Sequence, residues 1–371
     1  MDRLELYKKI GELKDEMTPD ERMQKYLKGE EVDCVPYGLL APDDAMAHIW
    51  GYTRGDMMRS FDLRCEIIRR KKEQYGFTGL SASMGLRGIA EVAGSVMFYP
   101  EESSDYVQEY CMKTYDSLGS IEPFSLIRGS ELVKRKLDEI SKMKEIFPEM
   151  GVSTDVAGPI STAIAMRPVE KVLRDVRREP EKLHQLMDYC VECSLEWVKL
   201  FCEKMGSCSV GISDPVTTTD ILGMKYFKEF SKPYLIKLFE GIKQISGNNP
   251  SLHICGHTRK IWNDLMEIGV DNFSLDNCED MREAKEVMGE RVFLSGNVAP
   301  VQVMRNGTID DVIGAVKEVL KKCADSPCGH MLLTGCQLPI GTSQENIDAF
   351  IYAARTYGRG ARMGRMPKGM E

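Results

Sequence analysis

The stretch Ser251-Leu-His-Ile-Cys-Gly-His-Thr258 predicts a short strand that ends at a glycine. Residues two apart on a strand point to the same face of a sheet, so His253 and Cys255 are expected to aim at one point. An imidazole and a thiolate together suit zinc better than other common metals. Two ligands do not hold a zinc ion, so the rest of the chain must supply the others.

This strand belongs to a regular series that predicts the fold. Candidate strands lie at residues 35–40, 77–82, 151–156, 209–214, 251–255, 272–276, 292–295 and 331–334. Helical patterns lie at residues 56–75, 168–205, 224–246, 259–268, 280–288, 309–323 and 344–356. Strands that alternate with helices predict a parallel sheet, and eight such units predict an α/β fold of the (β/α)8 TIM barrel type. We expect the 371 residues to form one such domain, residues 1–371.

The two ends of the chain are expected to lie outside the barrel. Residues 1–30 predict an N-terminal helical extension, broken near Thr18, where Pro19 and Glu21 complete the pattern of a capping box. Residues 359–371 carry several glycines among basic side chains, and this composition predicts a frayed tail.

The composition narrows the class of protein. Apolar residues make up 43% of the chain and charged residues 29%, which is typical of a globular protein with a large core. The net charge of −8 argues against a nucleic-acid partner. No apolar run approaches the ~18 residues of a membrane span, and the charged N-terminus lacks a signal-peptide core. The 12 cysteines are too sparse for a disulfide scaffold, so we expect reduced thiols in a cytoplasmic protein.

Candidate site residues stand at the carboxyl ends of the predicted strands, where the active site of a (β/α)8 barrel lies. In chain order these are Asp155 and Gly158, Asp214, His253 and Cys255, Asp276, Asn297, and Cys336. His253, Cys255 and Cys336 would converge at the barrel mouth as one nitrogen and two sulfur ligands. Three protein ligands leave the fourth tetrahedral position open, which is typical of catalytic zinc.

Other cysteines and histidines could serve as ligands instead. Cys190 and Cys193 form a Cys-x-x-Cys pattern, but inside a predicted helix and without a second pair. The set Cys323, Cys328, His330 and Cys336 has knuckle-like spacing; however, His330 and Cys336 flank a strand and would lie roughly 20 Å apart. His257 and Cys278 remain possible substitutes, because both are close in sequence to the proposed ligands or to Asp276.

Several segments resemble those of the uroporphyrinogen decarboxylase superfamily over about residues 18–357. They are Thr18-Pro-Asp-Glu-Arg22, Gly29-Glu-Glu-Val-Asp-Cys-Val-Pro36, Ile212-Ser-Asp-Pro215, His253-Ile-Cys-Gly256, Ser295-Gly-Asn-Val298 and Thr334-Gly-Cys336. Within that superfamily, His-x-Cys followed by a distant cysteine resembles the methylcobamide:coenzyme M methyltransferase branch. The arginine-rich signature of the decarboxylases is replaced here by Leu39-Leu-Ala-Pro-Asp-Asp44, whose acids would repel a carboxylate-rich substrate.

The resemblance implies a barrel enzyme that holds zinc through His253, Cys255 and Cys336. We expect it to transfer a methyl group between a methylcobamide carried by a corrinoid protein and a thiol like coenzyme M. Asp214 and Asn297 would line the pocket, and Asp276 would be a resting fourth ligand. Asp155 and Gly158 are the expected cofactor-binding residues.

Three alternatives remain open at this point. The enzyme could move a methyl group from a small donor to the corrinoid, or from the corrinoid to tetrahydrofolate. It could be a metal-free lyase like the decarboxylases. It could also bind a corrinoid or tetrapyrrole without catalysis.

Overall fold

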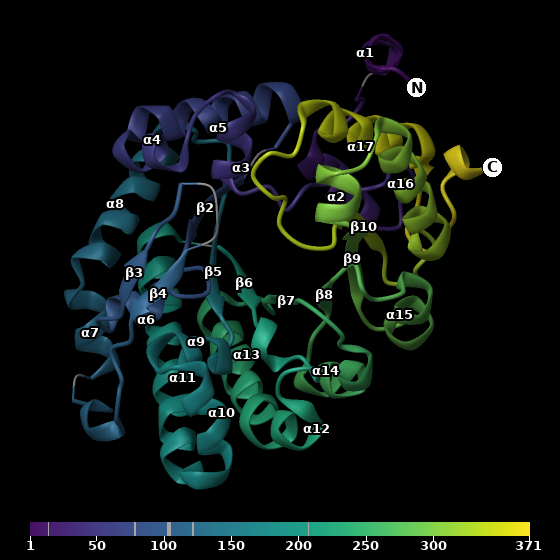
Figure 1. Cartoon of the computed structure of the whole chain (residues 1–371). Coiled ribbons are helices and arrows are strands. Elements are labelled where there is room, and N and C mark those ends of the chain that lie inside the picture. Colours follow the sequence, from purple (N-terminus) through teal and green to yellow (C-terminus); the bar gives the residue numbers. More distant parts are fainter. Residues whose placement is uncertain (14, 78, 102–104, 121, 207) are drawn as a thin grey trace. The chain divides into compact units, whose positions relative to one another are not determined.

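The protein is described by a computed structural model that covers residues 1–371 except residues 14, 78, 102–104, 121 and 207 (Figure 1). Contacts within the chain divide it into two compact units. One unit is Gly79–Val270, and the other combines Met1–Thr78 with Asp271–Glu371.

The unit Gly79–Val270 is built on four parallel strands. These are β2 (Gly79–Ser83), β5 (Gly151–Ala157), β6 (Ser209–Ser213) and β7 (Ser251–Ile254), which pair in that order. The register aligns Ser83 with Asp155, Ala157 with Ser213, and Ser213 with His253. The carboxyl ends of the four strands therefore meet at one edge of the sheet.

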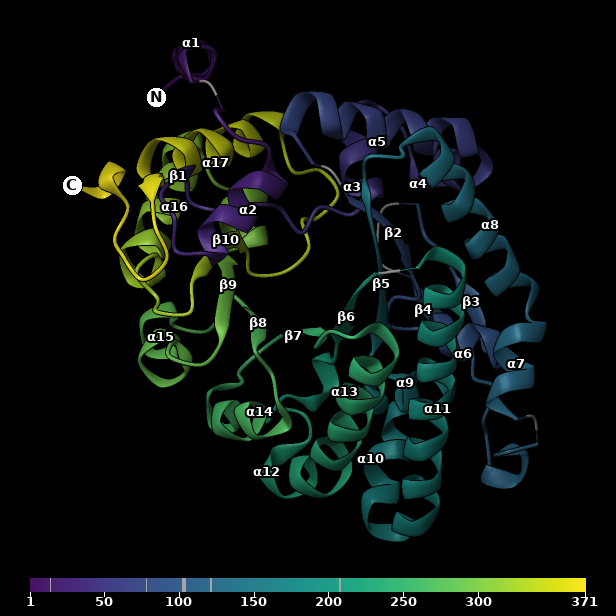
Figure 2. The same ribbon diagram turned by 180° about the vertical axis from the view of Figure 1, so that it is seen from behind.

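One face of this sheet is covered by helices. The long helices α8 (Glu131–Ile146), α11 (Pro180–Met205) and α13 (Lys232–Ser246) contact β2, β5 and β6 respectively (Figure 2). Leu80, Ile212 and Leu252 are buried, whereas the alternate residues Ser81 and His253 are exposed or partly exposed. Burial therefore alternates from one residue to the next along these strands, so the sheet has an apolar face under the helices and a polar face on the other side.

Shorter elements join these strands. They are α6 (Gly88–Val92), β3 (Val96–Phe98), β4 (Tyr106–Glu109), α7 (Pro123–Gly129), α9 (Pro159–Met166), α10 (Val169–Arg178), α12 (Gly223–Tyr226) and α14 (Trp262–Ile268). The helix predicted at residues 168–205 is two helices, α10 and α11. Pro180, at the first turn of α11, cannot continue the preceding helix because it has no N–H to donate.

The other unit contains three further parallel strands. These are β8 (Asn272–Leu275), β9 (Phe293–Val298) and β10 (His330–Thr334), and β9 pairs with both of the others. Its helices are α1 (Arg3–Glu12), α2 (Pro19–Leu27), α3 (Asp43–Ile49), α4 (Arg54–Arg59), α5 (Phe61–Tyr75), α15 (Met281–Met288), α16 (Ile309–Cys323) and α17 (Gln344–Tyr357). The capping box of Thr18 and Glu21 at the start of α2 is present as predicted.

The first predicted strand is shorter than the sequence indicates. The regular strand β1 is Val32–Cys34, and residues 35–40 make only one ladder bridge, between Tyr37 and Leu332 of β10. Two hydrogen bonds hold it, from Gly38 N to Leu332 O (3.0 Å) and from Leu332 N to Pro36 O (2.9 Å). Pro36 can accept but has no N–H to donate, which interrupts the ladder.

The prediction of a frayed tail at residues 359–371 was wrong. The strand β11 (Arg359–Ala361) pairs antiparallel with β1, and Lys368 forms an ion pair with Glu31 at 2.6 Å. The glycines and basic residues suggested mobility, but β1 offers an edge that satisfies the backbone of β11. That partner lies more than 300 residues earlier in the sequence, so local composition does not reveal it.

No helix in the described part of the chain has the length and apolar character needed to span a bilayer. In chain order the parallel strands alternate with helices, which is the arrangement predicted from the sequence.

Candidate metal centre

His253 and Cys255 lie next to each other at the end of β7. The Nε2 atom of His253 is 3.2 Å from Sγ of Cys255, and both side chains are partly buried. Gly256 follows with a φ of +80°, a conformation that residues with a Cβ rarely adopt. A Cβ there would also lie 3.4 Å from Oγ1 of Thr218, so glycine lets the chain turn closely after the two ligands.

The loop that follows β6 holds the segment after Cys255. The hydroxyls of Thr218 and Thr219 donate to the carbonyl oxygen of His257, at 3.0 and 3.4 Å. The side chain of His257 itself is exposed to solvent. The structure therefore gives the backbone of His257 a positioning role, whereas its imidazole is outside the ligand group.

Cys336 lies on the loop after β10, two residues beyond Thr334. Gly335 donates from its N–H to Val298 O at 2.8 Å, and a Cβ on Gly335 would come within 2.4 Å of Asn277 N. Only glycine permits so close an approach, and it fixes the path of the chain immediately before Cys336.

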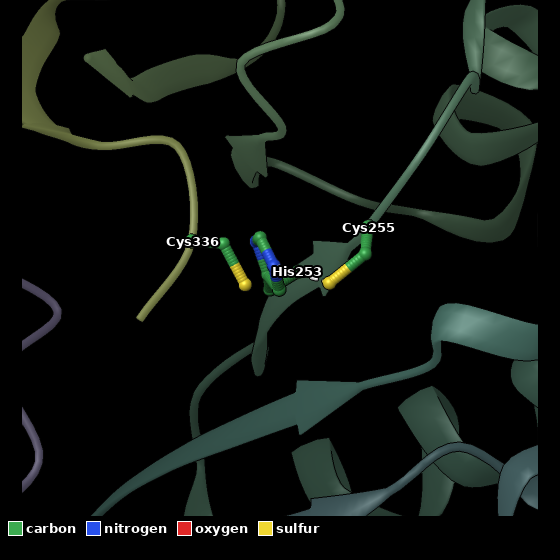
Figure 3. A group of neighbouring side chains, drawn as sticks. All are labelled: His253, Cys255 and Cys336. Carbon is green, nitrogen blue, oxygen red and sulfur yellow. Dashed lines mark hydrogen bonds between the residues drawn. The ribbon is translucent and has the colours of Figure 1, made fainter. Parts of the chain in front are cut away.

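The ligand atoms of His253, Cys255 and Cys336 all lie within 4.8 Å of one another (Figure 3). Zinc bonds of ~2.0–2.1 Å to nitrogen and ~2.3 Å to sulfur require ligand atoms at separations of this order. The donor set is one imidazole nitrogen and two cysteine sulfurs, which suits zinc. Among the described residues the group contains three ligands and no fourth.

A second group of potential ligands has a structural explanation. Asp15, Asp33 and Cys34 also lie close together, but Nε of Arg22 is 2.7 Å from Asp33 Oδ1. Burial raises the pKa of Cys34 to about 12, which disfavours the thiolate that a metal needs. We interpret this group as an ion-pair cluster that anchors α2 to β1.

Cys190, Cys193 and His330, which belong to the rival motifs, are buried in the core. Cys190 and Cys193 have no exposed surface within α11, and burial raises the pKa of Cys193 to about 12. His330 is also fully buried, at the first residue of β10, and its Nε2–H donates to Gly296 O at 3.1 Å. His330 therefore lies outside the ligand group, as the strand between it and Cys336 predicted.

The structural role of His330 can be tested through the pH dependence of the free energy of unfolding. Burial lowers the pKa of His330 to about 4 from an ordinary value of 6.5. Between these values the unfolded chain binds a proton that the folded chain does not, so the free energy of unfolding should fall as pH drops from 6.5 to 4. The difference corresponds to about 3 kcal/mol.

The variant His330→Gln, whose amide can still donate to Gly296 O, should lose this part of the pH dependence. Urea unfolding of both proteins at several pH values between 4 and 7 measures it. Parallel curves for the two proteins would contradict the assignment.

Asp214 is a fully buried carboxylate immediately after β6. Its Oδ1 accepts from Ser161 Oγ at 2.6 Å, and its backbone N–H donates to His253 O at 3.0 Å. Burial raises the pKa of Asp214 to about 6, and the hydrogen bond from Ser161 opposes this effect. Asp214 thus ties the end of β6 to the strand that carries His253.

Gly158 makes room for Asp214. A Cβ on Gly158 would lie only 2.0 Å from Cγ of Asp214 and 2.2 Å from its Oδ2. The backbone of Gly158 therefore packs flat against the carboxylate. This contact explains the glycine without a bound cofactor; the role in cofactor binding predicted for it stays a prediction.

Asp155 lies in a polar cluster at the ends of β2 and β5. Its Oδ1 accepts from Ser83 Oγ (2.7 Å) and Gly85 N (3.1 Å), and burial raises its pKa. Lys136 of α8 donates from Nζ to Ser83 O at 2.8 Å, and burial lowers the pKa of this lysine. Sequence reasoning missed Lys136 because it lies within a helix, away from the strand ends.

The side chain of Asn297 holds the backbone of the loop that carries Asp276. Nδ2 of Asn297 donates to the carbonyl oxygens of Asp276 and Glu279, at 3.0 and 2.8 Å. Oδ1 of Asp276 accepts from the N–H of Cys278 at 3.0 Å. Asn297 therefore positions the loop after β8, whereas the roles of Asp276 as a ligand and of Asn297 in the pocket stay predictions.

The chain is similar to known proteins over most of its length. The family model for uroporphyrinogen decarboxylase (URO-D) matches residues 18–357. A methylcobamide:CoM methyltransferase of Methanosarcina mazei is 24% identical over 350 residues, which cover 92% of this chain and 99% of the relative. One from Methanosarcina barkeri is 24% identical over 358 residues, with the same coverage of both chains.

A solved structure shares the fold. A methyltransferase from Methanosarcina mazei superposes with a TM-score of 0.76 at 23% identity, over 91% of this chain and 98% of that chain. The predicted (β/α)8 fold class is thereby confirmed.

Proposed function

The chain belongs to the uroporphyrinogen decarboxylase family, and from that premise we propose a zinc-dependent, corrinoid-dependent methyltransferase. It would transfer a methyl group between a methylated corrinoid, carried by a partner protein, and a small thiol. The observation that carries this proposal is the grouping of His253, Cys255 and Cys336 as one nitrogen and two sulfur donors. The relatives named for methyl transfer to coenzyme M support the reaction type.

The proposed ligands suit the chemistry of thiol alkylation. Zinc bound by these three residues would lower the pKa of a thiol that joins it, so that the thiol is deprotonated near neutral pH. Cys255 and Cys336, as thiolates, would balance the charge of the ion. The incoming sulfur would therefore keep much of its electron density and remain a nucleophile.

Transfer of the methyl group from the corrinoid to the thiol needs no external oxidant or reductant. The carbon–cobalt bond of the methylated corrinoid would break and a carbon–sulfur bond would form. The electron pair of the broken bond would stay with the corrinoid, and the proton of the thiol would go to solvent. The residues of this chain contribute by positioning the reacting groups. Groups that are already held in place lose little further translational and rotational entropy when they react. Thr218 and Asp214 fix the segment that carries His253 and Cys255 through the hydrogen bonds described above.

We further propose that Asp276 occupies the fourth ligand position when no thiol is bound. A carboxylate that is only partly buried, on a loop held by Asn297, can leave that position when a stronger sulfur ligand arrives. Asp155 would contact the corrinoid from the polar cluster at the ends of β2 and β5.

The direct test is an assay with small molecules. The zinc-loaded protein is mixed with methylcobalamin and either coenzyme M or tetrahydrofolate, and cobalamin absorbance and methylated product are followed. We expect transfer to the thiol and none to the folate, since the names of the relatives give coenzyme M as the acceptor. Tight cobalamin binding without turnover for any thiol would instead identify a binding protein and contradict the proposal.

A further inference from the structure

A basic groove lies on the unit Gly79–Val270, beside the segment that positions the metal ligands. It consists of two adjoining hollows of about 530 and 400 Å³, which share Arg177, Leu222 and Tyr226 as lining residues. One wall is the carboxyl half of α10, and the other is the chain between Ile221 and Tyr226. Ile221 is 48% exposed, so part of the lining is apolar.

The charge of the groove is positive on a chain that is negative overall. Arg174, Arg177 and Arg178 on α10 are exposed, as is Lys225 on the opposite wall. Within the described parts of the chain, none of the four has a carboxylate within ion-pair distance; Arg177 instead donates to the hydroxyl of Tyr226 at 2.6 Å. The chain as a whole carries −8, so this cluster is a local exception.

The groove is connected directly to the segment of the metal ligands. Its second wall continues from Thr218 and Thr219, whose hydroxyls bond the carbonyl of His257, two residues after Cys255. Its first wall, on α10, is separated from the end of β5 by α9, and β5, β6 and β7 end at the same edge of the sheet. A large molecule that reaches Cys255 from that edge would pass close to the groove.

We propose that this groove docks an acidic surface of the protein that carries the corrinoid. The inference rests on the proposed function, in which a second protein must bring the methyl group of its corrinoid to the metal ligands. Guanidinium groups pair with carboxylates in a bidentate manner, and Arg174 and Arg178, which have no carboxylate partner among the described residues, are available for such pairs. The remaining negative surface would repel the same partner and so favour this orientation.

The experiment compares a corrinoid bound to protein with a free corrinoid. In the double variant Arg174→Glu/Lys225→Glu, neither replaced side chain makes a hydrogen bond or an ion pair in the described structure, so the fold should be retained. The measured quantity is kcat/KM for methyl transfer to coenzyme M. The donors are a methylated corrinoid protein, purified from the same organism and identified by its cobalt, and free methylcobalamin.

We expect kcat/KM with the corrinoid protein to fall by roughly tenfold or more at low ionic strength, and the deficit to shrink in high salt. The value with free methylcobalamin should not change. The matched control is Lys199→Glu/Lys204→Glu, which reverses two exposed lysines near the carboxyl end of α11, where the chain leads into the amino end of β6. It should leave both values unchanged.

Three results would overturn the inference. They are an unchanged kcat/KM with the corrinoid protein, an equal loss with both donors, or an equal loss in the control variant. A wild-type protein that transfers no methyl group from free methylcobalamin would instead refute the proposed function, so the two failures are distinguishable.

Discussion

Replacing Cys336 by alanine should remove zinc from the protein and lower methyl transfer from methylcobalamin to coenzyme M by roughly a thousandfold or more. The substitution removes one of the two sulfur ligands. His253 and Cys255, with only the weaker carboxylate proposed for Asp276 beside them, should not retain the ion through gel filtration. The incoming thiol would then keep its proton and be a weak nucleophile. Zinc per chain after gel filtration, and the transfer rate of the same sample, measure the effect.

The matched control is Cys278→Ala. Cys278 is an exposed cysteine on the loop after β8 and lies outside the group of three ligands. This variant should keep its zinc and most of its activity. Full zinc occupancy in Cys336→Ala would show that Cys336 is not a ligand.

Gly158→Ala is expected to produce the largest loss of stability from the smallest change. The added methyl group would overlap the carboxylate of Asp214, at 2.0 Å from its Cγ, within a site that has no exposed surface. Either Asp214 or the start of α9 must move, and overpacking of this kind costs about 3 kcal/mol. Urea unfolding at neutral pH measures the loss.

Two further variants separate this contact from general damage. In Gly151→Ala, on the same strand β5, the added Cβ meets nothing within 4 Å, so this variant should be near wild type. The double variant Gly158→Ala/Asp214→Gly removes the overlapping carboxylate and also the Cβ of Asp214, which would lie 2.4 Å from the added methyl group, and it should recover part of the lost stability. A double variant no more stable than Gly158→Ala would show that Asp214 is not the obstacle.

Most of the barrel could be predicted from the sequence, because its signals are local. Short apolar runs that alternate with helical patterns placed β5, β6, β7, β8, β9 and β10 within a few residues of their bounds. Two of the failures depend on distant partners. The segment at residues 35–40 bonds to β10, and the tail bonds to β1, through pairings that no local pattern encodes.

The grouping of the candidate metal ligands was expected for a related reason. Strand-end positions and ligand-type side chains together predicted that His253, Cys255 and Cys336 come together, and their ligand atoms do lie within 4.8 Å of one another; that they bind zinc stays a prediction. The sequence could not show which side chains pack closely against one another. The contact between Gly158 and Asp214, and the bond from Lys136 to Ser83, depend on side-chain approaches that spacing does not determine.

The central claim is that one nitrogen and two sulfurs of this chain bind zinc and leave a position for a thiol. X-ray absorption at the zinc edge, with and without coenzyme M, tests it most directly. The account predicts two sulfurs at about 2.3 Å in the free protein and three when the thiol is present. A zinc shell that lacks sulfur, or one whose sulfur count does not change with coenzyme M, would contradict it.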